Sequence, residues 1–282
     1  MSAGARAVCR WVLALGLSCG LPVVSTSWAS SDEPARGGWA DPTLKWPDPL
    51  GETQLGAEGA YYWFTRADRF SLLPIATAER PLRIYVGGDS LSGGPAFGFE
   101  LLLEDDPRFE LTFDVRLSTG VITEWFFDWR LHLAEVVADG GYDVIVLSMG
   151  GNDGQRFSGH TDAVGSDPWR ATYQSRVAEM LSAVDRPGRL VVWVGMPPVT
   201  LDRIAELPAI VNPLTSAVAQ GRRSAFLDAA AIVAPGGVFT QTIQDSEGRD
   251  RTVRAGDGVH YTRDGGRLLA EQILLMIDQR SG

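Results

Sequence analysis

From residue 82 onward, short apolar runs alternate with longer segments whose apolar residues recur every three or four positions. The short runs predict buried strands, and the longer segments predict amphipathic helices. The predicted strands are 82–86, 111–117, 143–148, 190–195 and 225–227, and the predicted helices are 96–104, 128–138, 168–184, 201–221 and 264–279. This β-α-β order is typical of an α/β fold with a mostly parallel five-stranded sheet and helices on both faces.

A different pattern interrupts this alternation near the C-terminus. The segment 238–252 predicts a hairpin that turns near the Asp-Ser-Glu-Gly sequence at 245–248. The final predicted helix follows it. We therefore expect one α/β domain, 82–282, with a small antiparallel insertion before its last helix.

Residues 1–29 are typical of an export signal peptide. Arg6 and Arg10 precede the apolar run 11–24, and the small residues before position 30 fit cleavage after Ala29. The run is shorter than the ~20 apolar residues that span a bilayer. We expect a secreted or periplasmic (cell-envelope) protein without stable membrane insertion after processing, with a retained anchor as the alternative.

Both cysteines, Cys9 and Cys19, lie within this predicted leader. A processed chain would contain none, which removes disulfides, thiolate catalysis and cysteine metal sites. Lipid attachment at Cys19 is a second alternative for the leader, although the preceding Gly-Leu-Ser fits that pattern poorly. The net charge of −10 argues against nucleic acid and anionic lipid as partners.

The segment 30–81 is rich in proline and tryptophan and shows little periodicity. We expect an extended arm that packs on the main domain through the aromatic run 61–64, because clustered aromatic residues are most often buried. The alternative is that these rings form a substrate platform.

Ser90 ends a strand-like run at a glycine-rich turn, Gly87-Gly88-Asp89-Ser90. A strand delivers its last side chain to the carboxyl edge of a parallel sheet, where ligands bind in open α/β folds. Glycines permit the sharp reversal, and the N–H groups of a following helix favour negative charge. Ser90 is a candidate nucleophile, although Gly-Asp-Ser also occurs in ordinary turns.

A serine nucleophile needs a base, and the chain has three histidines. His132 lies in a predicted helix four residues after Asp128, which we expect to be its carboxylate partner. His160 lies in a polar loop in which no acid is arranged to orient it. His260 follows Asp257 by three residues in a glycine-containing loop, so Asp257 can orient its imidazole toward a serine. The favoured base is His260.

Acyl transfer also needs donors for the oxyanion. The N–H of Ser90, the N–H of a small residue after the second strand and the amide of Asn152 would converge at the sheet edge. Asn152 lies in Gly-Asn-Asp-Gly, which is also a turn-forming sequence. Asp89 and Asp153 are better interpreted as residues that staple loops than as catalytic acids.

Four blocks in this order resemble those of the SGNH, or GDSL-type, hydrolases: 88–91, Gly120, 150–153 and 257–260. The resemblance spans 82–280 and implies a flavodoxin-like three-layer α/β/α sandwich. It also implies that Ser90 is the nucleophile, Asp257 and His260 activate it, and Ser90, Gly120 and Asn152 form the oxyanion hole. The second block departs from the family, which usually has an asparagine shortly before its glycine, whereas this chain reads Leu-Ser-Thr-Gly.

The chain does not match the Gly-x-Ser-x-Gly elbow of α/β-hydrolases. The predicted function is an exported serine esterase that removes short acyl groups, such as acetyl, from extracellular or envelope carbohydrate. The alternatives are an O-acyltransferase with a sugar acceptor, or a non-catalytic glycan-binding module for envelope assembly. We expect no cofactor and no metal, because no ligand cluster is visible.

Aromatic residues follow Gly120 at 125–127 and at Trp129. Their faces suit the C–H surfaces of sugars, which favours acylated carbohydrate or a small ester as the substrate. The other interpretation, packing between the sheet and a helix, is the more common role of such residues.

Overall fold

The computed structural model describes residues 10–11, 73–139, 141–220 and 224–281. Its centre is a sheet in which all neighbouring strands are parallel, in the order β1-β3-β2-β4-β5-β6. The strands are β1 (Arg10–Trp11), β2 (Leu82–Gly88), β3 (Phe109–Val115), β4 (Val144–Ser148), β5 (Leu190–Val194) and β6 (Ser224–Leu227).

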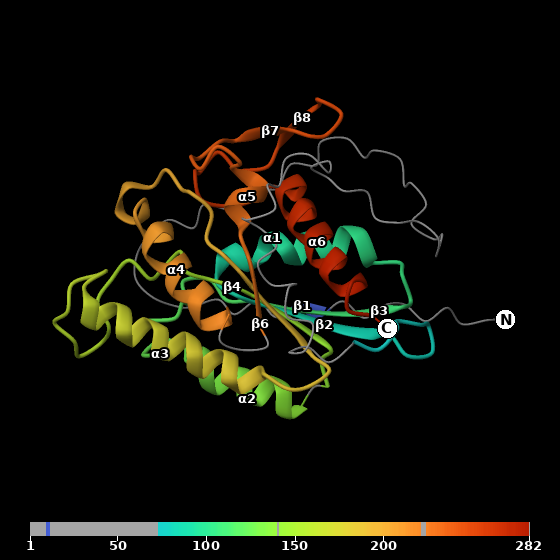
Figure 1. Cartoon of the computed structure of the whole chain (residues 1–282), viewed down its shortest axis with the longest axis horizontal. Helices are drawn as coiled ribbons and strands as arrows, with labels where there is room; N and C mark the ends of the chain where they lie inside the picture. The colour runs from blue at the N-terminus through green and yellow to red at the C-terminus, as the bar shows by residue number, and fades with distance from the viewer. Residues whose placement is uncertain (1–9, 12–72, 140, 221–223, 282) are drawn as a thin grey trace.

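Helices cover both faces of this sheet, which confirms the predicted three-layer α/β/α sandwich. Figure 1 shows α1, α5 and α6 above the sheet and α2 and α3 below it, and α4 packs against α3 and β6. The helices are α1 (Gly93–Leu103), α2 (Trp129–Asp139), α3 (Asp167–Val184), α4 (Leu207–Gln220), α5 (Ala229–Val233) and α6 (Arg263–Asp278). Every residue of β4 and β5 is buried because both faces are covered.

The sheet has one more strand than the five that the sequence predicted. Arg10–Trp11 forms β1 and pairs with Thr112 and Phe113 on the outer edge of β3. An edge strand presents unpaired N–H and C=O groups, which accept a short partner readily. These two residues lie within the predicted leader, so cleavage after Ala29 would leave the five predicted strands.

Two predicted elements have different bounds in the structure. The predicted strand 111–117 is Phe109–Val115, and the predicted helix 201–221 is a 3₁₀ turn, Asp202–Ile204, followed by α4. Pro208 lacks a backbone N–H, which suits the first turn of a helix, and α4 begins at Leu207; Pro213 lies farther along the same helix. The short helix α5 was not predicted.

The predicted hairpin is present as β7 (Thr242–Gln244) and β8 (Asp250–Thr252), which pair in antiparallel fashion. Asp245 accepts hydrogen bonds from the N–H groups of Glu247 and Arg249 and closes the turn. The hairpin lies above the sheet beside α5 and α6 (Figure 1).

The predicted leader, apart from β1, and the aromatic run 61–64 lie outside the described residues. The last part of the predicted arm is described from Leu73, which is buried. Its N–H donates to the carbonyl of Arg280 at 2.7 Å. None of the helices in the described ranges is long and apolar enough to cross a membrane.

The sheet order brings three chain segments together at one edge. β2 lies between β3 and β4, so the residues that follow these strands begin side by side at their carboxyl ends. The edge that carries the predicted site residues is therefore built from the segments that follow β2, β3 and β4.

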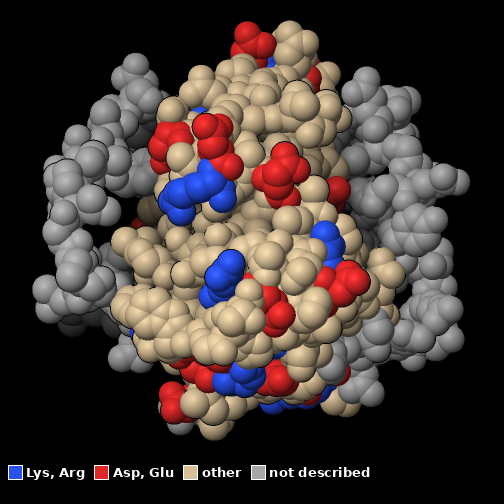
Figure 2. All heavy atoms as spheres, turned by 90° about the vertical axis from the view of Figure 1, so that its left-hand side faces the viewer, with Lys and Arg blue, Asp and Glu red and all other residues tan. Residues whose placement is uncertain are grey.

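On the face drawn in Figure 2, acidic and basic side chains are interspersed with uncharged ones.

Candidate active site

Ser90 stands immediately beyond the carboxyl end of β2. Asp89 caps the 3₁₀ turn Ser90–Ser92 by accepting a hydrogen bond from Leu91 N–H at 2.8 Å, and α1 begins at Gly93. Ser90 is half-buried, whereas Asp89 is fully buried. This turn places Ser90 at the sheet edge, and the buried Asp89 side chain fixes the backbone of the turn.

Ser90, His260 and Asp257 form one hydrogen-bonded chain, although they are distant in sequence. His260 Nε2 lies 2.8 Å from Ser90 Oγ, and His260 Nδ1 lies 2.7 Å from Asp257 Oδ2. A proton on Nδ1 shared with the carboxylate leaves Nε2 free to accept from the serine hydroxyl. This is the geometry that a nucleophile, a base and an orienting acid require.

The loop that carries Asp257 and His260 is held by its own backbone. Asp257 Oδ1 accepts from Val259 N–H and His260 N–H, each at 2.9 Å. Gly258 has φ +75°, and a Cβ there would lie 1.8 Å from Thr200 Oγ1, so this position accepts only glycine. Burial alone would raise the pKa of Asp257, but hydrogen bonds from His260 and Val259 hold it below its ordinary value.

Arg254 supports the same loop by hydrogen bonds to its carbonyl groups, a role that the sequence did not reveal. It is fully buried, and it donates to the carbonyls of Pro198 and Val259, each at 2.8 Å, and to that of His260 at 3.4 Å. Within the described ranges it forms no ion pair, and burial lowers its pKa. An isolated arginine six residues before a histidine gives no signal of burial, so only the fold identifies it.

Three groups are candidate oxyanion donors: the backbone N–H groups of Ser90 and Gly120 and the side-chain amide of Asn152. Across the described part of the chain, the N–H groups of Ser90 and Gly120 donate to no protein acceptor. Asn152 Nδ2 donates to the carbonyl of Thr119 at 2.8 Å, which uses one of its two protons and fixes the amide plane. The second proton reaches only Asp89 Oδ2, at 3.5 Å, a distance at which a hydrogen bond is weak.

Asp89 ties the segment after β2 to the segment after β4. Its Oδ2 accepts from the N–H groups of Gly150 and Gly151, each at 2.9 Å, while its Oδ1 accepts from Leu91. Burial raises its pKa to about 6 against the opposing effect of these hydrogen bonds. The side chain positions Ser90 and the Asn152 loop relative to each other, as a stapling residue does.

Asp153 joins the segment after β4 to the segment after β3. It accepts from the N–H groups of Val121 and Ile122, each at 3.3 Å, and from the Tyr173 hydroxyl at 3.0 Å. A Cβ at Gly120 would lie 2.2 Å from its Oδ1. Burial, followed by the nearby charge of Asp89, raises the pKa of Asp153 to about 7. The two carboxylates thus link all three candidate donors.

The surroundings of the other two histidines differ from those expected. The Asp128 partner predicted for His132 is wrong, because His132 Nε2 contacts the buried carboxylate of Asp114 on β3. His160 was expected to lack an orienting acid, but its Nδ1 lies 3.5 Å from Asp162 Oδ2. The partner of His132 comes from a separate strand that meets α2 only in the folded chain.

The aromatic residues after Gly120 divide into two groups. Trp129 is buried and Phe127 packs against it with ring centroids 5.1 Å apart, as packing residues do. Trp125 and Phe126 are exposed. The packing interpretation therefore holds for half of this cluster only.

Over the described residues, no group of three or more histidine, cysteine, aspartate or glutamate side chains is arranged to hold a metal ion. A hydroxyl, an imidazole, a carboxylate and a set of N–H donors are the components of nucleophilic acyl transfer.

Comparison with solved structures places this arrangement among known folds. A Bacteroides fragilis protein assigned as an acylhydrolase shares 15% identity over 71% of this chain and 90% of its own, with a TM-score of 0.50. An acetyl xylan esterase variant from Geobacillus stearothermophilus shares 18% identity over 70% and 95% of the two chains, with a TM-score of 0.48. A carbohydrate acetylesterase family member from Sinorhizobium meliloti shares 15% identity over 70% and 98%, with a TM-score of 0.47.

No curated protein matches the chain. A family described as "Protein of unknown function (DUF459)" matches residues 83–276, which is most of the chain and nearly all of its described α/β domain. The sheet order and the helices on both faces are those of the SGNH (GDSL-type) hydrolase fold. The chain therefore belongs to the DUF459 family and has the SGNH hydrolase fold.

Proposed function

We propose that this protein is a serine esterase that hydrolyses carboxylic esters through an acyl-Ser90 intermediate. The observation that carries the proposal is the hydrogen-bonded chain from Ser90 Oγ through His260 to Asp257, with spacings of 2.8 and 2.7 Å. These spacings fall within the range that a nucleophile and its base require.

In the first half of the reaction, Ser90 Oγ attacks the ester carbonyl carbon and its proton passes to His260 Nε2. The resulting imidazolium is stabilised by Asp257. The tetrahedral intermediate then collapses, the bond to the alcohol oxygen breaks, and His260 returns the proton to that oxygen. The products of this half are a free alcohol and acyl-Ser90.

In the second half, water takes the place of the alcohol. His260 removes a proton from the water as its oxygen attacks the acyl carbon, and the same proton then returns to Ser90 Oγ as the carboxylic acid leaves. In both halves the carbonyl oxygen becomes an oxyanion, for which the N–H groups of Ser90 and Gly120 and the Asn152 amide are the proposed donors.

The preferred substrate is a short acyl ester, such as an acetyl group, on extracellular or cell-envelope carbohydrate. Support comes from the openness of the site: the side chains of His260 and Asp257 are 36% and 50% exposed. An exposed base and acid suit a bulky, polar alcohol portion better than a long acyl chain, which needs an enclosing apolar pocket. We also propose that residues 1–29 direct the protein out of the cytoplasm.

The proposal is tested by the turnover of 4-nitrophenyl acetate by purified protein. Ser90→Ala, His260→Ala and the double variant should each lower kcat by about 10⁴-fold or more, and the double variant should be little worse than either single one, because the two residues act as a unit. The exposed Ser175 on α3 provides the matched control, Ser175→Ala, which should be unaffected. Turnover by Ser90→Ala at the wild-type rate would overturn the proposal.

A further inference from the structure

Residues 121–128, which follow Gly120, form a segment that we call the aromatic loop. Trp125 and Phe126 lie at its centre with 67% and 40% of their surface exposed. Their ring centroids are 5.9 Å apart, with 52° between the ring planes. Both belong to the large apolar side chains that the described part of the chain leaves in solvent, and they are consecutive.

The first residues of the loop, directly after Gly120, are anchored to the core. The side chains of Val121 and Ile122 are buried in the core, and their N–H groups donate to the buried carboxylate of Asp153. The Thr123 hydroxyl donates to the carbonyl of Gly120 at 3.3 Å. The loop base therefore shares its anchor with the candidate oxyanion donor Gly120.

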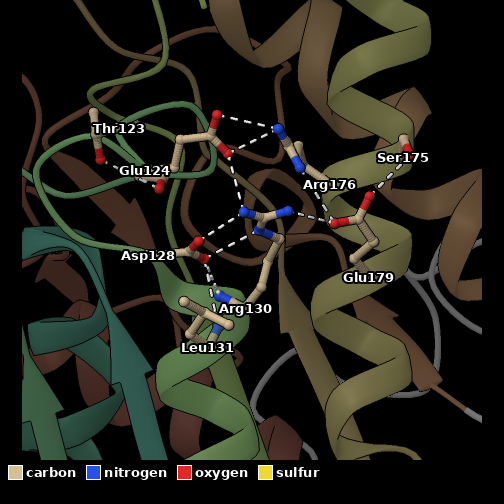
Figure 3. Close-up of polar contacts among 9 residues, drawn as sticks. Thr123, Glu124, Asp128, Arg130, Leu131, Ser175, Arg176 and Glu179 are labelled. Atoms are coloured by element: carbon tan, nitrogen blue, oxygen red, sulfur yellow. Dashed lines mark hydrogen bonds and ion pairs between the residues drawn. The ribbon is translucent and has the colours of Figure 1, made fainter. Parts of the chain in front are cut away.

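Ion pairs fix the loop to α2 and α3 around the two exposed rings. Figure 3 shows Glu124, which directly precedes Trp125, facing Arg130 and Arg176. Arg130 also pairs with Asp128 at 2.6 Å and with Glu179 at 2.7 Å. Charges from both helices therefore hold the backbone on either side of Trp125 and Phe126.

Next to the exposed pair, Phe127 turns inward. The guanidinium of Arg116 lies 4.2 Å from the centroid of the Phe127 ring, and the Phe127 and Trp129 rings pack edge to face. The chain thus partly buries Phe127 and presents the two aromatic residues before it to solvent. Packing accounts for Phe127 but gives no reason for two large apolar rings held outside the core.

A rigid pair of aromatic rings in water is suited to binding, because little conformational entropy is lost when a ligand stacks on it. The loop leaves β3 at the same sheet edge as Ser90, and Trp125 is the fifth residue after Gly120. A chain of that length spans at most about 17 Å. A carbohydrate chain can reach across such a distance, whereas a single short ester cannot.

We propose that Trp125 and Phe126 form a binding surface for a sugar ring of the carbohydrate chain whose ester group lies at Ser90. The inference rests on the proposed esterase function and adds a second contact region to it. The rings offer apolar faces to sugar C–H groups, while the partly exposed Glu124, Arg130 and Arg176 offer charged partners for hydroxyls. Such charged neighbours favour a polar ligand over an acyl chain or a lipid surface.

The test compares wild type, Trp125→Ala and Phe126→Ala with Leu101→Ala, an exposed apolar residue late in α1 that serves as the matched control. Each is assayed on 4-nitrophenyl acetate and on a panel of O-acetylated xylose, glucose and N-acetylglucosamine, supplied as monosaccharides and as β-1,4-linked tetrasaccharides. We expect Trp125→Ala to raise KM for the preferred tetrasaccharide roughly three- to tenfold, the range of a single aromatic contact. Kinetics on 4-nitrophenyl acetate and on monosaccharides should not change.

Binding is measured separately by calorimetry, with the deacetylated tetrasaccharides titrated into Ser90→Ala and into Ser90→Ala/Trp125→Ala. The expected result is weaker binding by the double variant with at least one of the sugars. Equal affinities, or wild-type KM values that do not differ between tetrasaccharide and monosaccharide for any sugar, would overturn the proposal.

Two further outcomes decide against the surface in distinct ways, and a third decides against the esterase function alone. An effect of Trp125→Ala that grows with the acyl chain length of 4-nitrophenyl esters would assign the rings to the acyl group instead. An equal loss on all substrates would mean that the loop only supports Gly120. Failure of wild type to turn over 4-nitrophenyl acetate would refute the esterase function, while the calorimetry would still report on the sugar contact.

Discussion

Gly120→Ala is the change that most directly probes how the proposed oxyanion site is built. A Cβ at this position would lie 2.2 Å from Asp153 Oδ1 and 3.1 Å from its Cγ. The carboxylate cannot easily withdraw, because it accepts hydrogen bonds from Val121, Ile122 and Tyr173 in a fully buried position. The backbone of Gly120 must therefore move instead.

The magnitude follows from the contact distances. Relief of the contact to an ordinary ~3.4 Å requires a displacement of about 1 Å, which would lengthen a hydrogen bond of ~2.9 Å from the Gly120 N–H beyond its effective range. Loss of one oxyanion donor lowers kcat by about 10²–10³-fold. Insertion of a methyl group into a packed site costs about 1–3 kcal/mol of folding free energy.

The assay is kcat and KM on 4-nitrophenyl acetate, with thermal unfolding measured on the same samples. Gly93→Ala is the matched control, because a Cβ there meets only Phe97, at 3.9 Å. We expect Gly120→Ala to remain folded and to lose kcat with little change in KM. A variant with a lowered melting temperature and wild-type kcat would refute the role of Gly120 as a donor.

Asn152→Ala is expected to lower kcat about 10²–10³-fold, because its amide is a proposed donor; wild-type kcat would remove it from the site. Arg254→Met should lower kcat more than it changes KM, because the carbonyls of the His260 loop lose their donor; an unchanged kcat would argue against this positioning role. The raised pKa of Asp153, about 7 against 3.8, means that the folded state holds its proton more tightly, so this group's stabilisation is present at low pH and is lost as pH rises toward 7. Denaturant unfolding at pH 5 and pH 8 should therefore show a smaller pH-dependent loss of stability in Asp153→Asn than in wild type, and equal losses would contradict the shift.

The main architecture was predictable because it depends on local patterns. Strands buried on both faces read as continuous apolar runs, and the helices between them alternate regularly. The pair Asp257 and His260 was also predictable. His260 follows Asp257 by three residues, and the glycine between them lets one loop bring carboxylate and imidazole together. Ser90 could be inferred because it stands at a strand end.

The remaining features depend on contacts between distant segments. Arg254 is held by the carbonyl of Pro198 as well as by its own loop, and nothing near it in the sequence indicates burial. His132 meets Asp114 only when α2 packs beside β3. The local sequence does not distinguish Trp125 from Trp129. In the fold, Trp125 is exposed in a loop held by ion pairs, whereas Trp129 is buried at the start of α2.

The central claim, that Ser90 accepts the acyl group, is tested most directly by covalent labelling. Purified protein is treated with a fluorophosphonate probe, digested, and the modified residue is mapped by mass spectrometry, with Ser90→Ala treated in parallel. The account predicts a single adduct on Ser90, formed more slowly when a saturating ester substrate is present and absent from the variant. Turnover of 4-nitrophenyl acetate without an adduct on Ser90 would contradict it.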